Sequence, residues 1–374
     1  MAASPAARLD LSVKCRQRNV QSKNGSLRKK QKKKVSEYRT VCTADDDDDG
    51  LIEYDTKPLP KRRSTKKKKV VKNGTAPAIG SNIQTPNAVY EIVRRLGSGG
   101  YGEVFHVKDQ AARDYAMKTE PVKPGEEKVQ PGEVLVFEEI AKAKKLQPEG
   151  FPHLINMFES GIVGNMRYIV MTLTGPSLND ATKKHKLKYH TALRLSIHSL
   201  DAIDEFHRVG LIHRDIKPEN FLTSRCGRKL IYLADFGMCC AIPKREQKLP
   251  KESSYSFLGT VTYASRTSHK GMVQSRKDDI ESWIYMCLEF FKKKVLPWDE
   301  DDQAKALKLK EAFFRDPPKL VNAAKAPFFF VMACRKVDEC SFFDAPNYKA
   351  IREGLMQRAI AEKVDFDKLF DWEP

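Results

Sequence analysis

His213-Arg214-Asp215-Ile216-Lys217-Pro218-Glu219-Asn220 is the stretch that decides how the rest of this 374-residue chain is interpreted. An acid, a lysine and an amide stand at offsets 0, +2 and +5 within one short loop. Transfer of a phosphoryl group needs little covalent help from a protein and depends on in-line positioning and cancellation of negative charge. The octapeptide therefore predicts a loop that brings a hydroxyl, a phosphate and a metal ion together.

A glycine-rich turn between two apolar runs lies upstream of this loop. Residues 90–96 and 104–107 are predicted to be strands, and Gly97, Gly99 and Gly102 have the spacing G-x-G-x-x-G. Because a strand rather than a helix follows the third glycine, the pattern favours a hairpin that covers phosphates over a dinucleotide-binding turn. A glycine-rich hairpin without a ligand is the alternative.

A lysine and an acidic helix follow the hairpin. Lys118 ends an apolar third strand and is predicted to contact phosphate. The next helix is predicted over residues 131–145, and one of its glutamates should pair with Lys118. Register against Leu146 favours Glu139, with Glu138 as the alternative.

A break between two structural regions is predicted near residue 174. Residues 166–173 form an apolar strand that ends at a Gly-Pro pair. Beyond the break, apolar residues recur at spacings of three and four over 191–208, which indicates a helix with one buried face.

A second acidic motif, Asp235-Phe236-Gly237, follows a short apolar strand. Asp235 and Asn220 would supply hard oxygen ligands to Mg²⁺. Asp215 would accept or orient the proton of an incoming hydroxyl, and Lys217 would neutralise the transferring phosphate. His213 is expected to be a packed residue that stabilises the loop.

Six further segments carry a family resemblance: 173–178 (LTGPSL), 213–222 (HRDIKPENFL), 259–265 (GTVTYAS), 275–282 (SRKDDIES), 296–298 (LPW) and 370–373 (FDWE). Together with the motifs above they resemble eukaryotic protein kinases of the casein kinase 1 superfamily, nearest the tau-tubulin kinase-like branch and its divergent nematode members. The resemblance covers 88–374. It implies an α+β, bilobal fold, with a small β-rich N-lobe over about 88–173 and a larger helical C-lobe over about 174–374.

The resemblance also implies an ATP- and Mg²⁺-dependent Ser/Thr protein kinase with protein substrates. Its catalytic residues would be Asp215, Lys217, Lys118 and Thr260, and its metal ligands would be Asn220 and Asp235. Its nucleotide-binding residues would be Leu96, Gly97, Ser98, Gly99, Gly100, Tyr101, Gly102, Glu103, Val104, Ala116, Lys118, Glu139, Met171, Thr172 and Thr174. Thr260 would hydrogen-bond Asp215 and Lys217, and Asp279 would cap the backbone of the same loop.

One position departs from the family pattern. Casein kinase 1 proper carries an arginine in the G-T-x-R-Y segment, within a basic pocket that recognises acidic or phosphorylated substrate residues, and this chain has Thr262 there. Threonine cannot make the bidentate, charge-assisted contacts of arginine with phosphate, which weakens the expectation of primed-substrate recognition. Nearby Lys270, Arg276 and Lys277 would either favour acidic substrates or form an ordinary solvated surface.

Charge is concentrated in residues 1–87, which carry 21 Lys and Arg against 9 Asp and Glu, a net charge of +12 within a total of +18. Basic runs at 28–34 and 61–69 flank an acidic run at 45–49. Blocks of like charge repel and bury little, so the segment is predicted to be a disordered basic extension. Nuclear import, contact with nucleic acid or another acidic partner, and a plain solvated tail remain open for the basic runs.

The eight cysteines show no C-x-x-C pair and no histidine at zinc spacing. The chain has no secretory leader and no apolar run of about 20 residues. These features predict an intracellular monomer, in the cytoplasm or the nucleus, without a membrane partner. Inactive relatives of kinases usually lack the strand lysine, the catalytic aspartate or the metal-binding aspartate. All three are present here, as Lys118, Asp215 and Asp235. An active enzyme is therefore favoured over a pseudokinase scaffold.

Overall fold

The computed structural model describes residues 77–99, 102–122, 132–183, 185–225, 229–246, 257–298 and 302–373. It also describes two short antiparallel strands, β1 (Val41–Cys42) and β2 (Ile52–Glu53). The rest of the predicted extension, and therefore its basic and acidic runs, lies outside the described residues.

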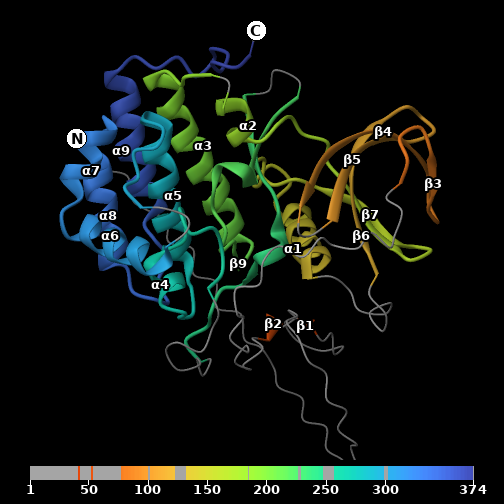
Figure 1. The fold of residues 1–374 in the computed structure, drawn as a ribbon, viewed down its shortest axis with the longest axis horizontal. Coiled ribbons are helices and arrows are strands. Elements are labelled where there is room, and N and C mark those ends of the chain that lie inside the picture. The colour runs from red at the N-terminus through yellow and green to blue at the C-terminus, as the bar shows by residue number, and fades with distance from the viewer. Residues whose placement is uncertain are drawn as a thin grey trace, which may run out of the picture. The chain divides into compact units, whose positions relative to one another are not determined.

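The first lobe is a six-stranded antiparallel sheet with one helix (Figure 1). In sheet order its strands are β3 (Asn82–Gln84), β4 (Val89–Gly99), β5 (Gly102–Lys108), β6 (Asp114–Pro121), β8 (Met166–Met171) and β7 (Met157–Val163). Alternate side chains of the strands, such as Phe105 and Val107 of β5, meet in a buried core. The helix, α1 (Gly132–Leu146), lies within one residue of its predicted bounds.

The folded lobe begins earlier than residue 88. β3 pairs with β4 in the register Asn82–Glu91, Ile83–Tyr90 and Gln84–Val89, and Ile83 is only 6% exposed. The prediction of disorder up to residue 87 is therefore wrong for this stretch. A three-residue edge strand is too short to show periodicity, and its partner lies several residues further along the chain.

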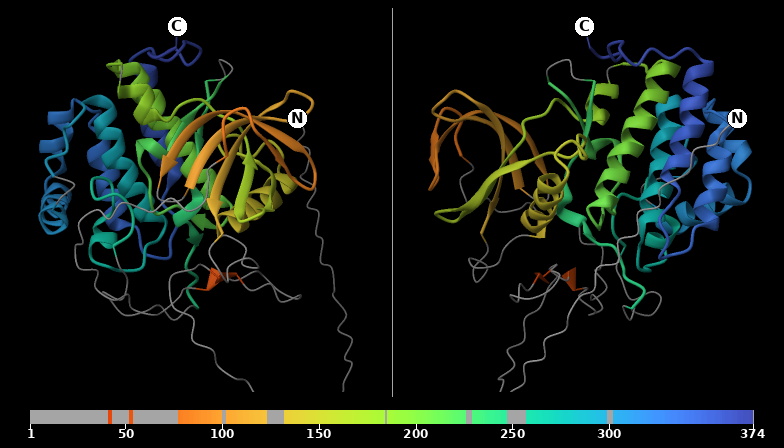
Figure 2. Two further views of the ribbon diagram at one scale, coloured as in Figure 1. Left: turned by 45° about the vertical axis from the view of Figure 1, so that its right-hand side comes forward. Right: turned by 180° about the vertical axis from the view of Figure 1, so that it is seen from behind.

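The second lobe is helical (Figure 2). Its helices are α2 (Leu178–Lys183), α3 (Tyr189–Arg208), α4 (Arg266–His269), α5 (Arg276–Phe291), α6 (Gln303–Arg315), α7 (Pro317–Ala324), α8 (Phe329–Glu339) and α9 (Tyr348–Ala361). α5 is buried over most of its length and packs against α3, where Trp283 donates a hydrogen bond to the Ser199 hydroxyl at 3.0 Å. The predicted bilobal α+β fold is confirmed.

Two small antiparallel strand pairs position the loops between the lobes. One pairs β10 (Phe221–Thr223) with β11 (Ile231–Leu233), and the other pairs β9 (Leu211–Ile212) with β12 (Cys240–Ala241). The single-turn helices η1 (Pro218–Asn220) and η2 (Phe236–Met238) lie between these strands. The two strand pairs therefore bring the stretch 213–220 and the motif 235–237 together. None of the described helices combines the length and the apolar character that crossing a membrane requires.

Candidate active site

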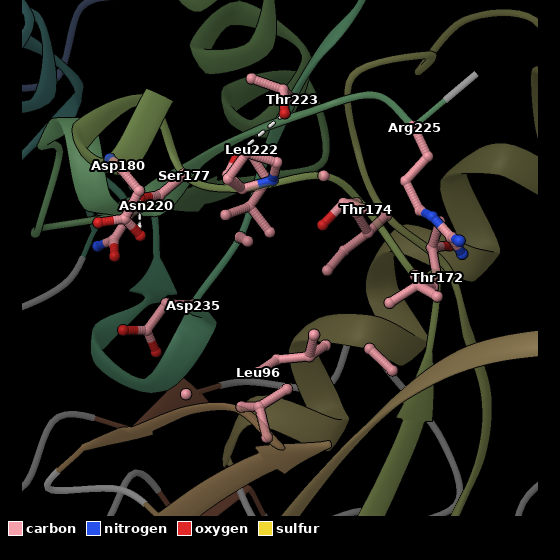
Figure 3. Close-up of a pocket in the computed structure, with 18 of the residues that line it drawn as sticks. Leu96, Thr172, Thr174, Ser177, Asp180, Asn220, Leu222, Thr223, Arg225 and Asp235 are labelled. Atoms are coloured by element: carbon pink, nitrogen blue, oxygen red, sulfur yellow. Dashed lines mark hydrogen bonds between the residues drawn. The ribbon is translucent and has the colours of Figure 1, made fainter. Parts of the chain in front are cut away.

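A cavity of about 1100 Å³ lies between the sheet and the helical lobe (Figure 3). The predicted site residues that line it are Leu96, Gly97, Gly102, Val104, Ala116, Lys118, Met171, Thr172, Thr174, Asn220 and Asp235. Ser98, Gly99 and Glu103 belong to the same hairpin without being among its lining residues. Glu103 instead forms an ion pair with Arg95 at 2.8 Å. Gly100 and Tyr101 lie outside the described residues.

Gly102 is the glycine whose conformation the hairpin requires. Its φ is +116°, a region that other residues rarely adopt, and a Cβ at this position would collide with the carbonyl oxygen of Thr119. The close approach of β5 to β6 therefore depends on this glycine.

Lys118 forms its ion pair with Glu133 and not with Glu139. The Lys118 ammonium donates to Glu133 Oε2 at 2.5 Å, and Asp235 Oδ1 lies 3.9 Å away. Burial opposes the charge on the lysine, but the carboxylates of Glu133 and Asp235 outweigh it and raise the pKa of Lys118. Glu139, 41% exposed, instead pairs with Lys142 one helical turn further on, at 2.8 Å.

The prediction of Glu139 is wrong because Leu146, the apolar residue that sets its helix register, does not face the core. Leu146 is 84% exposed, whereas Ile140, six residues earlier, is 1% exposed. The paired glutamate lies two helical turns before the apolar residue that faces the core. With Ile140 as that residue instead of Leu146, the paired position is Glu133 instead of Glu139. The spacing of buried Phe137 and Ile140 is the sequence signal that indicates this register.

The side chains of the catalytic loop form a closed network. The Lys217 ammonium lies 2.6 Å from Asp215 Oδ2 and donates to Thr260 Oγ1 at 3.0 Å. The Thr260 hydroxyl donates to Asp215 Oδ1 at 3.1 Å. The Asn220 amide nitrogen donates to the Asp215 carbonyl at 2.8 Å and to its carboxylate at 3.2 Å. The predicted contacts of Thr260 with Asp215 and Lys217 are thus present.

Asp279, at the start of α5, fixes the backbone of this loop. Its carboxylate accepts from the N–H groups of His213 at 2.7 Å and Arg214 at 2.8 Å, and from His207 Nε2 at 2.8 Å. Burial alone would raise the pKa of Asp279, but the hydrogen bond and charge of His207, with the further groups around it, hold it below the usual value. The predicted cap is confirmed. It supports a strained turn, because Arg214 has a φ of +68°.

Packing of Phe236 directs Asp235 toward the cavity. The Phe236 ring stacks on Phe206 at 5.3 Å and meets the edge of Phe137 of α1 at 5.1 Å. His213 is fully buried beside it, donating to the Ala234 carbonyl at 3.0 Å, which agrees with its predicted structural role. Asp235 itself adopts a left-handed conformation, with a φ of +62°.

Asn220 and Asp235 present oxygen ligands at one end of the cavity (Figure 3). Because the Asn220 amide nitrogen donates to Asp215, its amide oxygen is left as a free acceptor toward the cavity. Mg²⁺ typically takes one or two protein oxygens and completes its shell with water and phosphate oxygens. One carboxylate and one amide oxygen therefore fit this ion.

The hinge between the lobes is held from both sides. The Thr172 N–H donates to the Asn156 carbonyl at 2.9 Å, and the Gly175 N–H donates to the Thr223 carbonyl at 2.7 Å. A Cβ at Gly175 would collide with the Thr223 hydroxyl. Between these two anchors, Thr174 borders the cavity as predicted.

The cavity lining also contains polar residues that the sequence did not predict, among them Ser177, Asp180 and Arg225. Ser177 and Asp180, at the start of α2, line the mouth and share a hydrogen bond of 3.0 Å. They form an S-x-x-D capping pattern, which marks a helix start in many proteins and does not by itself indicate a ligand. Arg225 also lines the mouth, and its guanidinium lies 3.5 Å from Asp114 of the opposite lobe.

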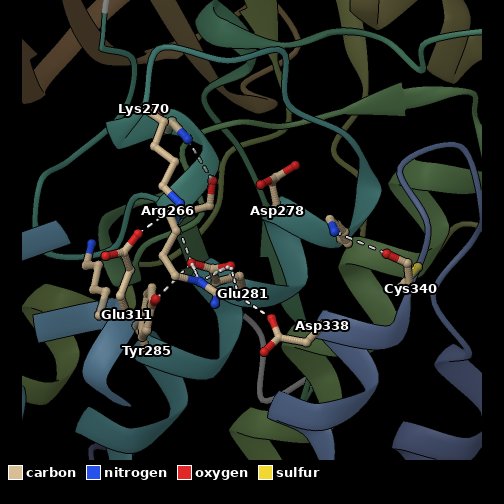
Figure 4. Close-up of polar contacts among 12 residues, drawn as sticks. Arg266, Lys270, Asp278, Glu281, Tyr285, Glu311, Asp338 and Cys340 are labelled. Atoms are coloured by element: carbon tan, nitrogen blue, oxygen red, sulfur yellow. Dashed lines mark hydrogen bonds and ion pairs between the residues drawn. The ribbon is translucent and has the colours of Figure 1, made fainter. Parts of the chain in front are cut away.

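The three basic residues near Thr262 are engaged within the protein. Lys270 pairs with Glu311 at 2.8 Å (Figure 4). Arg276 donates to the Phe343 carbonyl at 2.5 Å, and Lys277 donates to the Cys340 carbonyl at 3.1 Å. These contacts favour a structural use of the three cations over an anion-binding surface.

Comparison with known proteins identifies the family of the chain. The family model "Protein kinase domain" matches residues 90–328. The chain is also 29% identical, over 300 residues, to the serine/threonine-protein kinase spe-6 of Caenorhabditis elegans, an alignment that covers 78% of this chain and 77% of that protein. The matched region contains the glycine-rich hairpin, the Lys118–Glu133 pair, the catalytic loop and the Asp235 motif. The chain belongs to the protein kinase domain family.

Proposed function

We propose that the chain is an active Ser/Thr protein kinase, which transfers the γ-phosphate of ATP to hydroxyl groups of protein substrates in the presence of Mg²⁺. The observation that carries the proposal is that two networks are complete, one lining the cavity and the other joined to the cavity through Asn220. Lys118 is paired with Glu133 on the sheet side, and Asp215 is bound to Lys217 and Thr260 on the helical side. A binding scaffold would not need both.

Each residue then has a task that follows from its position. Glu133 holds the Lys118 ammonium where the α- and β-phosphates of a nucleotide would lie. Asp215 Oδ is placed to accept the proton of the attacking hydroxyl, and Lys217 offsets the charge on the transferring phosphate. Asn220 and Asp235 would hold Mg²⁺, which when bound neutralises phosphate charge and orients the phosphates for in-line transfer.

The remaining cavity residues would bind the rest of the nucleotide. The backbone of the hinge near Thr172 and Thr174 would hydrogen-bond the adenine, and Leu96 and Val104 would cover its faces. Ser177 and Asp180 would bind the ribose hydroxyls, because both offer oxygen atoms at the cavity mouth.

We further assign the chain to the casein kinase 1 superfamily, nearest its tau-tubulin kinase-like branch. Support comes from the family segment 259–265, in which Thr260 contacts Asp215 and Lys217. The segment 173–178 connects the two lobes, and 275–282 contains Asp279, which caps the backbone of the catalytic loop. Similarity to a C. elegans Ser/Thr kinase supports the substrate class.

The substitutions Glu133→Gln and Glu139→Gln test the ion-pair assignment. Glu133→Gln should lower kcat/KM about ten- to hundredfold, because a charge-assisted hydrogen bond to Lys118 is replaced by a neutral one. Glu139→Gln, the same change on the exposed side of the same helix, should leave it within about twofold. Steady-state kinetics with a peptide substrate measures both. Equal losses in the two variants would contradict the pairing.

The substitution Thr262→Arg tests the account of substrate choice. The natural chain should phosphorylate unprimed peptides at least as well as peptides with a phosphoserine upstream of the target. Thr262→Arg should shift the ratio of kcat/KM values toward the primed peptide, because arginine adds a bidentate phosphate contact. An unchanged ratio would show that this position does not control priming.

The proposed activity itself is tested with purified protein, [γ-³²P]ATP, Mg²⁺ and a Ser/Thr peptide library. We expect transfer of ³²P to serine and threonine residues of the peptides, and we expect this transfer to require Mg²⁺. Nucleotide binding without transfer would instead indicate a pseudokinase scaffold.

A further inference from the structure

The segment 257–270, which carries Thr260, is held by a buried lysine. Lys310 of α6 is 0% exposed, and its ammonium donates to the carbonyls of Val261 at 2.7 Å and Ala264 at 2.6 Å. It also donates to His269 Nε2 at 3.0 Å. All of these acceptors belong to the segment, and α6 lies some 40 residues further along the chain.

The surroundings of Lys310 are otherwise aromatic. Its ammonium lies 4.8 Å from the centre of the Tyr285 ring and 5.5 Å from that of Trp298. Burial lowers the pKa of Lys310 to about 7. A neutral amine retains two N–H groups, enough for both carbonyls, so the hold on the backbone does not require the positive charge.

The two hydrogen bonds decide what Lys310 acts on. Taking an amine out of water costs free energy, and the hydrogen bonds to two buried carbonyls offset that cost. The position of the Lys310 side chain is therefore coupled to the backbone that carries the Val261 and Ala264 carbonyls.

The rest of the segment has other anchors. The Arg266 N–H donates to Glu281 Oε1 at 2.6 Å, and its guanidinium contacts Glu281 and Asp338 (Figure 4). Trp298 donates to the Thr262 carbonyl at 2.8 Å. The backbone contacts of Lys310 are therefore confined to the two ends of the turn 261–264, and its third contact is with the His269 ring.

That turn leads directly to the catalytic loop. The N–H groups of Tyr263 and Ala264 both donate to the Thr260 carbonyl, at 2.9 and 2.8 Å, so Thr260 belongs to the turn that Lys310 grips. The hydroxyl of Thr260 contacts Asp215, and it accepts from Lys217. A shift of the turn would move this hydroxyl away from both side chains.

We propose that Lys310 is a positioning residue for phosphotransfer, which acts through the backbone of the turn 260–264 on Thr260 and thereby on Asp215 and Lys217. The proposal rests on the kinase activity proposed above. Lys310 contacts neither substrate nor nucleotide, and its effect should appear in the rate of transfer rather than in nucleotide affinity.

The test compares Lys310→Met with Lys308→Met, the same change at an exposed position of the same helix. Lys310→Met should lower kcat for a peptide about ten- to hundredfold, because small displacements of catalytic groups are costly. The Kd for ATP should stay within twofold. Tm should fall by a few degrees, because the carbonyls of Val261 and Ala264 lose their donor, so kcat is compared at a temperature where both variants are folded. Lys308→Met should match the natural protein in all three. A natural protein without transferase activity would overturn the proposed function, whereas an active natural protein with an equally active Lys310→Met variant would overturn only the role of Lys310.

A double-mutant cycle with Thr260→Val separates positioning from general support. If Lys310 acts through Thr260, adding Lys310→Met to Thr260→Val should change kcat by less than twofold. If the kcat loss of the double variant instead equals the product of the two single losses, Lys310 does not act through Thr260 and the proposal is overturned. Should Lys310→Met fail to fold, Lys310→Gln, which keeps N–H groups for a carbonyl, takes its place in the cycle. Failure of both variants to fold would assign Lys310 to stability and overturn the proposal.

Discussion

Asp215→Asn is expected to lower the rate of phosphotransfer by about a hundred- to ten-thousandfold, the usual contribution of a general base. The amide has nearly the shape of the carboxylate, and its oxygen can still accept from Thr260. It cannot take a proton from the attacking hydroxyl, and it withdraws the negative partner of Lys217, which lies 2.6 Å away. Single-turnover transfer from labelled ATP to a peptide measures this loss directly.

Nucleotide binding and folding serve as the controls for Asp215→Asn. Because Asp215 is not among the residues that line the described cavity, the Kd for ATP should change by less than about threefold. Far-ultraviolet circular dichroism and Tm should match the natural protein. Transfer within a few-fold of the natural rate would mean that another group is the base.

Asp279→Ala is expected to cause the largest loss of stability, about 3–5 kcal/mol in the free energy of unfolding. The substitution leaves the N–H groups of His213 and Arg214 and the ring of His207 buried without their acceptor. Activity should fall with it, because the turn at Arg214 loses its support. Urea unfolding followed by tryptophan fluorescence measures the change.

The neighbouring Asp278 provides a matched control on the same helix. It is equally buried, but its carboxylate accepts from the Ser275 N–H at 2.7 Å in a helix-capping box. Asp278→Ala should therefore cost about 1 kcal/mol, as helix caps do. Equal costs for the two substitutions would contradict the anchoring role of Asp279.

The Asp279 carboxylate makes the stability of the protein depend on pH in a defined direction. The pKa of Asp279 is lowered in the folded state, so its contribution to stability is fully present above its unfolded pKa of about 3.9. That contribution is lost as the pH falls through the lower folded value. The difference in stability between the natural protein and Asp279→Ala should therefore be constant near neutral pH and shrink below about pH 4.

Local spacing was sufficient to predict much of the site. Asp215, Lys217 and Asn220 lie within six residues of one loop, so any fold that forms the loop brings them together. Asp235 follows a short buried strand, β11, whose pairing with β10 fixes its place beside Asn220. The Asp279 cap depended on the family resemblance, since nothing in its own neighbourhood indicates which backbone it contacts.

Long-range choices were the part that the sequence did not decide. The sequence predicted Glu139, with Glu138 as the alternative, whereas the burial of Ile140, two helical turns after Glu133, places Glu133 on the buried face of α1. Lys310 resembles any lysine on an amphipathic helix, and only the packing of α6 against 257–270 buries it. β3 became a strand through pairing with β4 and not through its own composition.

The central claim is that a complete and active phosphotransfer site exists on this chain. Its most direct test is the Mg²⁺-dependent transfer of labelled γ-phosphate from ATP to peptide serine and threonine by the purified natural protein, with Asp215→Asn measured beside it. The account predicts sustained turnover by the natural protein and its near-complete loss in the variant, with equal ATP affinity. No transfer by the natural protein, or equal transfer by both, would contradict it.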